Sequence, residues 1–429
     1  MTEASSEPVP AAASRVRHGP SGLAIVLIST AVAGGLGYII QTVAGLALTP
    51  AQYKGFGVFW ATLYLIVGGV SGIQQEVSRA TREPEAERDK KASNPLRSFV
   101  VVFAVFVAIV IAASTPLWVG AVFPGHVVTS ASAVVVGAVS YVGFATISGV
   151  LYGRKAWPIL ALVVVVDPAL RLLFVSIALG VGGDQELLDW AIVLPIPITF
   201  LLSLLLVRFR LPHRSVVDVP LRVLVSNSAQ TIVGTTATAV LVSGLPLFIG
   251  ASSGGEDPSD VGSLIFNITL TRAPLVIPFL ALQSYLIVHF RDQLRALWAS
   301  LLKVLAIVAV ATVVASVLVW LFAPVVVGWI FGSGYVLSGA TLAGLVASAG
   351  LTGALCVSGP AVIARSGHTA FLVGWVLAAL CLVAVLFTPW DLLSRTATAL
   401  VVAPLLGLIV HLGYLLLFDL GERRASTSS

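Results

Sequence analysis

Long apolar stretches recur along the whole chain, and they give the first prediction. A window of about 19 residues finds twelve of them, each close to the roughly 20 residues that a helix needs to cross a bilayer. Their limits are 22–48, 56–76, 98–122, 127–151, 157–182, 188–207, 222–250, 261–289, 297–323, 337–364, 369–388 and 396–418. The pattern predicts an all-α polytopic membrane protein with about twelve transmembrane helices.

The basic residues between these segments predict the orientation of the chain. With the N-terminus in the cytoplasm, all but four of the 24 Lys and Arg residues fall on the inner side. Lys54 and Arg395 then lie outside, and Arg171 and Arg272 lie within the membrane. Because positive residues favour cytoplasmic loops, both chain ends are predicted to be cytoplasmic.

The longer polar stretches divide the chain into two halves. We expect six-helix bundles at 21–207 and 222–419, joined by a cytoplasmic linker at 208–221 that contains Pro212 and Pro220. Residues 1–20 have the composition of a disordered cytoplasmic tail, and residues 420–429 form a second cytoplasmic tail.

The turns of the two halves resemble one another at an offset of roughly 200 to 212 residues. The turn at 123–126 corresponds to the one at 331–335, and the turn at 152–155 corresponds to the one at 364–367. Since each half has an even number of spans, the halves are predicted to form a parallel pseudo-repeat about an axis along the membrane normal.

Composition excludes several classes of function. Hydrophobic residues make up 58% of the 429 residues and charged ones only 10%, which leaves no room for a separate soluble catalytic domain. No stretch reads as a P-loop, and no metal-ligand spacing or nucleophile–base pair is present in the sequence. The net charge of +5 follows from the inner loops. We therefore predict no enzymatic activity, no cofactor, no metal and no nucleic-acid partner.

Charged residues inside the apolar segments carry the most information, because each costs about 2.5 to 3.5 kcal/mol on insertion scales. Asp167 and Arg171 are four residues apart in one predicted helix, within salt-bridge reach, and Arg272 lies in the second half at a similar depth. Asp167 pairs either with Arg171 or, across the bundle, with Arg272. Either pairing leaves one positive charge, and a guanidinium suits phosphate oxygens. An anionic ligand in a central cleft between the halves is expected.

Polar and helix-breaking residues add to the expected cleft. Gln41, Asn227, Gln230 and Asn267 are predicted to join Arg171 and Arg272 in binding the substrate, and Asp167 to serve as a coupling group or a permanent ion-pair partner. Prolines would bend helices that line a cavity. These prolines are Pro168, Pro195, Pro197, Pro246, Pro274, Pro278 and Pro360. The cluster of Gly34, Gly35 and Gly37, together with Gly68, Gly69 and Gly72, is predicted to permit close helix packing instead.

Two groups of residues resemble the motifs of a known superfamily. Leu48, Pro50, Tyr53, Gly55 and Phe56 are similar to the Leu-Gly-Pro-x-x-Tyr-Gly-x-Phe turn of polysaccharide-export flippases, with Thr49 in place of the glycine and Lys54 inserted. The second group resembles the Ala-Pro and Phe-Gly-x-x-Tyr pattern of helices 9 and 10, and a Val-Gly pair that precedes helix 8. Ala323 and Pro324 match the Ala-Pro pair, and Phe331, Gly332 and Tyr335 match the Phe-Gly-x-x-Tyr pattern. Val261 and Gly262 match the Val-Gly pair.

This resemblance is to the multidrug/oligosaccharidyl-lipid/polysaccharide (MOP) exporter superfamily. It implies two six-helix bundles in a V, which carry a polyprenyl-phosphate- or pyrophosphate-linked saccharide across a bacterial plasma membrane by alternating access. Arg272 would help to hold the diphosphate, and glycosyltransferases or a polymerase of the same pathway would be partners. The chain lacks the arginines that some relatives carry in helices 1 and 2, which argues against a peptidoglycan precursor.

Other functions stay open at this point. An ion-coupled multidrug antiporter of the same superfamily would favour unpaired acids in the cleft. A membrane glycosyltransferase would need a larger outer loop than the short ones present here. A membrane scaffold in an envelope-assembly complex would need none of the buried charges.

Overall fold

The fold is that of a helical membrane protein, as the hydropathy pattern predicts. The computed structural model describes residues 22–82, 95–210, 216–217 and 219–428. Within these residues, eleven helices are long and apolar enough to cross a membrane, and a pair bent by 67° forms a twelfth candidate span. The chain is therefore a multi-pass membrane protein with the predicted number of spans.

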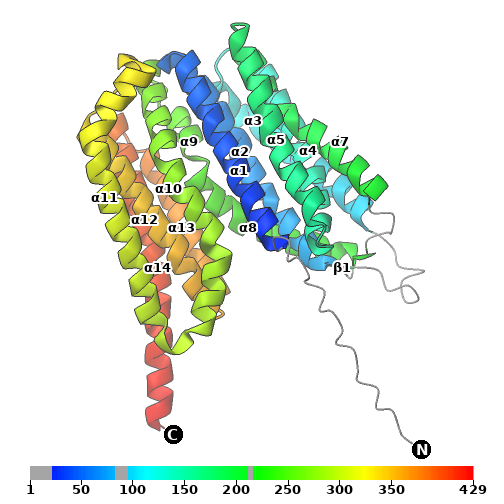
Figure 1. The fold of residues 1–429 in the computed structure, drawn as a ribbon, viewed down its shortest axis with the longest axis vertical. Helices are drawn as coiled ribbons and strands as arrows, with labels where there is room; N and C mark the ends of the chain where they lie inside the picture. The colour runs from blue at the N-terminus through cyan, green and yellow to red at the C-terminus, as the bar shows by residue number, and fades with distance from the viewer. Residues whose placement is uncertain (1–21, 83–94, 211–215, 218, 429) are drawn as a thin grey trace, which may run out of the picture.

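The first half contains seven helices, two of which share one span (Figure 1). They are α1 (Gly22–Ala47), α2 (Pro50–Ala80), α3 (Leu96–Val122), α4 (Val127–Gly153), α5 (Trp157–Gly180), α6 (Gln185–Val193) and α7 (Pro195–Arg210). A break at Leu194 separates α6 from α7 because Pro195 starts a new helix there.

The second half contains the bent pair and five longer helices. They are α8 (Leu221–Val242), α9 (Leu245–Ser252), α10 (Pro258–Asp292), α11 (Leu297–Phe331), α12 (Gly339–Ala364), α13 (His368–Leu386) and α14 (Leu392–Ser428). Short 3-10 turns η1 (Leu294–Ala296) and η2 (Ser333–Tyr335) lie before and after α11.

Local capping explains where one helix departs most from its predicted start. The apolar stretch predicts a helix from residue 56, whereas α2 begins at Pro50. Thr49 caps it: its hydroxyl accepts from the Gln52 amide, and the Gln52 side chain bonds back to the Thr49 backbone. Proline at the first helical position suits this start.

The predicted prolines behave in two ways. Pro195 and Pro246 stand at the first turns of α7 and α9, where the spans are broken. Pro168, Pro274 and Pro278 lie inside the continuous helices α5 and α10, as does Pro360 inside α12. The expected interruptions thus occur only where a new helix can begin.

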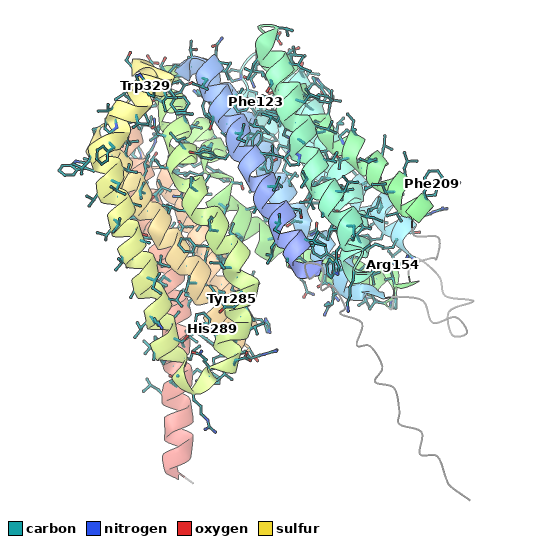
Figure 2. All side chains as sticks on the ribbon, viewed as in Figure 1. Phe123, Arg154, Phe209, Tyr285, His289 and Trp329 are labelled. Carbon is teal, nitrogen blue, oxygen red and sulfur yellow. The ribbon has the colours of Figure 1, made fainter. Side chains whose placement is uncertain are left out.

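The first described residues of α1 and the end of α14 lie at the same end of the molecule (Figure 1). We call this the inner end and the opposite one the outer end, following the predicted orientation, which stays a prediction. Figure 2 places Arg154 and His289 towards the inner end, and Phe123 and Trp329 near the outer end. The side chain of Phe209 is 75% exposed, as suits contact with lipid.

The predicted linker and tails are partly described. Residues 1–20 lie outside the described residues. Within 208–221, Val216–Val217 (β2) pairs antiparallel with Thr81–Arg82 (β1), which ties the linker to the end of α2. At the C-terminus, α14 continues as a helix through 420–428, where a tail was expected.

Each of the turns chosen as equivalent contains one residue with positive φ, and in both pairs this residue lies one position earlier in the turn of the second half. Gly125 and Gly332 have φ of 89° and 88°, and Lys155 and Ser366 have φ of 53° and 59°. These residues are 207 and 211 positions apart, within the predicted offset. The turns therefore support the repeat locally, while the repeat of whole halves stays a prediction.

Close packing of α2 on α8 joins the halves. A Cβ atom on Gly68 would lie 2.6 Å from Cβ of Ala239, and one on Gly72 would lie 2.9 Å from the backbone nitrogen of Ile232. The Thr235 hydroxyl donates to the Gly69 carbonyl at 2.6 Å. The glycines of α2 therefore serve helix packing, as predicted, and let the two backbones approach. The same prediction is wrong for Gly35 and Gly37 of α1, because nothing lies within 4 Å of a Cβ atom on either one.

We expect Gly72→Val to destabilise the protein by about 1–3 kcal/mol, because the new side chain meets the α8 backbone, which cannot move aside as a side chain would. Thermal unfolding in detergent, followed by tryptophan fluorescence, measures this. Gly35→Ala is the matched control, since nothing lies within 4 Å of a Cβ there. Equal melting temperatures for both variants would contradict the packing role.

Candidate functional site

A buried ion pair occupies the interior of the first half. The helical spacing places Asp167 and Arg171 on one face of α5, and their charged groups are 2.9 Å apart. Arg171 also donates from Nε to the Ile192 carbonyl at 2.8 Å and from Nη1 to the Tyr64 phenol. Only 2% of Arg171 is exposed. The predicted pairing of Asp167 with Arg171 is the one that forms.

Aromatic rings complete this polar centre. The Arg171 guanidinium carbon lies 5.4 Å from the Tyr64 ring centroid and 5.9 Å from that of Trp60, within the range of cation–π attraction. Beside it is a cavity of about 40 Å³. The cavity is lined by Leu63, Tyr64, Val67, Tyr141, Phe144, Asp167, Arg171 and Ile196. Its volume suits one or two water molecules and excludes a sugar.

Arg272 occupies the interior of the second half, in surroundings that differ sharply from those of Arg171. Its guanidinium donates to the hydroxyls of Thr352 and Ser348, at 3.2 and 3.4 Å, and to the Leu241 carbonyl at 3.4 Å. It is 6% exposed. Among the described residues no carboxylate forms an ion pair with it. One buried positive charge thus has no counter-charge in the part of the chain that the structure describes.

The two arginines lie in separate bundles. Every partner named for Arg171 belongs to the first half, and every partner named for Arg272 belongs to α8 or α12. The alternative pair between Asp167 and Arg272 does not form. The expectation that both arginines line one floor of a central cleft therefore needs correction, because helix packing within each half encloses them.

The halves meet again at the outer end, in a contact that we call the outer seal. It consists of Pro50, Tyr53, Gly262, Phe266 and Tyr335. A Cβ atom on Gly262 would collide with the Pro50 carbonyl oxygen, so α10 and the first turn of α2 touch through their backbones. The Phe266 ring packs against Tyr53 and Tyr335, with centroids 5.1 and 4.5 Å away.

Hydrogen bonds lock the outer seal. The Tyr335 phenol donates to the Leu48 carbonyl at 2.9 Å, across the halves. Burial raises the pKa of this phenol, so it stays protonated and able to donate. The Asn267 amide donates to the Tyr335 carbonyl at 2.8 Å, which positions the turn after α11.

Two predicted substrate residues belong to this seal. Gln41 accepts a hydrogen bond from the Tyr53 phenol at 2.6 Å, and Asn267 supports Tyr335 as described. Both are buried. The other two, Asn227 and Gln230, lie in the first turns of α8 near the inner end. Gln230 is eleven residues from Leu241, so it is about 16 Å along the helix from the Arg272 contact.

Sequence reasoning missed two acids that the structure encloses wholly or in part. The helix α6 begins at Gln185, capped by Asp184, and carries Asp189 into the protein with no exposed surface. The N-capping aspartate was the signal for this helix start. Glu76 of α2 accepts from Thr231 of α8 at 3.3 Å and pairs with Arg79 at 2.9 Å, so it bridges the halves near the inner end.

Metal ligation receives no support from the described residues. They contain no group of three or more His, Cys, Asp or Glu side chains that could hold a metal ion. Cys356 and Cys381 are free thiols in the second half.

Comparisons with known proteins identify relatives. No protein-family model matches the chain. The uncharacterized protein Rv3630 of Mycobacterium tuberculosis is 31% identical over 393 residues, covering 90% of this chain and 89% of its own. Rv1510 of the same organism is also 31% identical over 393 residues, covering 90% of both chains. The chain belongs to the same family as these mycobacterial proteins.

Solved structures with the same fold are members of the MOP superfamily. An inward-facing multidrug resistance MATE family transporter of that superfamily matches with a TM-score of 0.68 and 16% identity, over 90% of this chain and 97% of its own. The lipid II flippase MurJ in an inward closed conformation also gives a TM-score of 0.68, with 11% identity, over 90% of this chain and 86% of its own. The resemblance predicted from the sequence motifs is confirmed at the level of the fold.

A third solved structure has the same fold. An outward-facing MATE family transporter of the MOP superfamily gives a TM-score of 0.61, with 15% identity, over 95% of this chain and 96% of its own.

We expect Tyr335→Phe to weaken the outer seal, because it removes the hydrogen bond to the Leu48 carbonyl. The loss of about 1 kcal/mol would raise the opened population roughly fivefold. A cysteine placed at the buried Ala44 should then react about fivefold faster with an impermeant maleimide. Tyr414→Phe is the control, since that phenol bonds Arg365 within the second half near the inner end. Equal labelling rates in both variants would argue against a seal.

We also expect the Asp167–Arg171 pair to behave as one energetic unit. Asp167→Asn and Arg171→Gln should each destabilise the protein by about 1–3 kcal/mol, because each leaves one buried partner unpaired. The double variant should be little worse than either single one. Chemical unfolding of all four proteins gives the coupling energy, and additive losses would show that the pair is not coupled.

Proposed function

We propose that the protein is a membrane transporter that flips a polyprenyl-phosphate- or pyrophosphate-linked saccharide across the bacterial plasma membrane for cell-envelope polysaccharide synthesis. Alternating access would move the head group, with no covalent chemistry. The fold supports the transporter class, since its solved neighbours are named as a multidrug transporter and a lipid II flippase. The mycobacterial relatives support a bacterial membrane.

The observation that carries the proposal is the unneutralised Arg272. A buried cation without a carboxylate is costly to the protein alone, and an anionic ligand would offset that cost. Its planar guanidinium can bind two phosphate oxygens in parallel, and the adjacent Ser348 and Thr352 hydroxyls could add hydrogen bonds. A transporter of cations has no evident use for this group.

The arrangement of the inner helices suits a substrate with a lipid tail. On one side, α2 packs tightly against α8 through Gly68 and Gly72. On the other side, α1 and α10 touch nearer the outer end, where Tyr38 donates to the Leu270 carbonyl, and their inner ends diverge (Figure 1). Apolar Leu27 and Leu282 on these helices are 49% and 47% exposed. A polyprenyl tail would stay in the bilayer between α1 and α10 while the head group enters.

An ion-coupled antiporter for organic cations is the second candidate. The cavity beside Asp167 supports it, because aromatic rings and a carboxylate are suited to such ligands. Two features weigh against it: the carboxylate is already paired with Arg171, and a volume of about 40 Å³ holds no drug.

Glycosyltransferases or a polymerase of the same pathway would be the protein partners of a flippase.

We expect cells depleted of the protein to accumulate lipid-linked saccharides on the inner leaflet. Wild type should reverse this accumulation, whereas Arg272→Gln should lose at least about tenfold in transport, because a bidentate charged contact is removed. Arg272→Lys should have an intermediate transport rate, since it keeps the positive charge but loses the guanidinium that binds two oxygens at once. Extraction and quantification of the lipid-linked saccharides measures the effect.

The control for this experiment is Arg79→Ala, which removes a largely exposed arginine outside the buried centres. Membrane levels and melting temperature of each variant establish that it folds. If depletion causes no accumulation and efflux of organic cations falls instead, the antiporter is favoured. If neither changes, a scaffold is the better description.

A further inference from the structure

Asp189 is a buried carboxylate that the transport proposal leaves without a role. It lies in the second turn of α6, near the outer end of the first half, and has no exposed surface. An ionised carboxylate removed from water is costly unless a cation or several donors compensate it. The charges and hydrogen-bond donors around Asp189 therefore decide what it can bind.

Among the described residues, no Lys, Arg or His forms an ion pair with Asp189. The ring of His126, just before α4, lies 3.1 Å from Glu186 of α6, and Arg171 of α5 is bonded to Asp167. Neither of these, nor Lys54 of α2, forms an ion pair with Asp189 in the described part of the chain. α7 carries its basic residues near its far end, at Arg208 and Arg210.

The two hydrogen-bond partners of Asp189 are neutral, and one of them can change from hydrogen-bond donor to acceptor. Gln185 donates from Nε2 to one carboxyl oxygen, and the Ser130 hydroxyl donates to the other, both at 2.6 Å. An amide nitrogen can only donate, but a hydroxyl can also accept. If Asp189 carried a proton, Ser130 could accept it in a hydrogen bond and turn its own hydrogen to the His126 carbonyl four residues earlier.

We propose that Asp189 is a proton-binding site that opens to the outer side of the membrane. Burial disfavours the charged carboxylate, and the Ser130 hydroxyl can turn to accept a hydrogen bond from a proton on it, so a proton fits the site. A metal ion would need more oxygen ligands than the described partners of Asp189 supply. Glu186, whose side chain is 44% exposed and one turn away, together with His126, forms the exchange route to the outer surface.

The site is linked to the outer seal through one amide. A Cβ atom on Gly55 of α2 would collide with Oε1 of Gln185, so this side chain fills the space between Asp189 and the hairpin that carries Pro50 and Tyr53. A proton on Asp189 therefore changes the hydrogen bonding of Gln185, which packs on the hairpin that carries Pro50 and Tyr53. On the proposed transport function, this would make protonation from outside a step in opening the seal.

Infrared difference spectroscopy on the purified, substrate-free protein tests the site directly. At about pH 6, ordinary carboxyl groups are ionised, so a protonated carboxylic acid band there reports an unusual group. We expect this band in wild type, its reversible loss on raising the pH, and its absence in Asp189→Asn. Glu256→Gln should keep the band, because this carboxylate pairs with Arg395 in the second half, away from the site. A band that persists in Asp189→Asn, or is missing from wild type at every pH above about 5, would overturn the proposal.

Ser130→Ala is a second test of the site in case Asp189→Asn fails to fold, because it retains the Asp189 carboxyl group. It removes a donor to the charged form, so the band should persist to higher pH by about one unit. An unchanged midpoint in Ser130→Ala would contradict the switching role of the hydroxyl. A band that responds to sodium at constant pH would show a cation site in place of a proton site. Because no substrate is present, these outcomes are independent of the Arg272→Gln complementation.

Discussion

Backbone contact between α2 and the second half is the constraint on which the structure depends. Gly72 admits the backbone of α8, and Gly262 of α10 admits the first turn of α2. Neither contact would survive an ordinary side chain. Because one helix makes both contacts, α2 forms the closed wall on one side of the halves and half of the seal at their outer end.

The interior charges show how two bundles of one fold can differ. In the first half, Asp167 neutralises Arg171, and aromatic rings cover the pair. In the second half, hydroxyls and a carbonyl surround Arg272 without neutralising it. A bilayer supplies no water to solvate such a group, so an uncompensated charge has to find a partner in a ligand or in another conformation. This asymmetry is the basis of the anion-binding role proposed for Arg272.

A shared fold does not by itself choose between drug export and lipid flipping, since the same architecture occurs in a MATE family transporter and in the MurJ flippase. The choice rests on the chemistry of the interior. On the proposed function, the guanidinium of Arg272 would bind the anionic head group, and a lipid tail would lie beside α1 and α10. Asp189, on the outer side of the first half, adds a group through which a proton could drive the cycle.

The sequence by itself determined the number of spans and most of their limits, and it placed Asp167 and Arg171 on one helical face within salt-bridge reach. It also determined the role of the glycines in α2. These features depend on residues close in the chain, because a bilayer requires every spanning segment to satisfy its own backbone and to be apolar over a fixed length. Only the tertiary structure decided that the two family motifs meet, with Tyr335 bonded to Leu48 287 residues away. It likewise placed Gln41 and Asn267 in a seal, confined Arg272 to its own half and buried Asp189. The partner of a buried polar group is set by helices that pack together from distant parts of the chain, and a local hydropathy pattern carries no record of that packing.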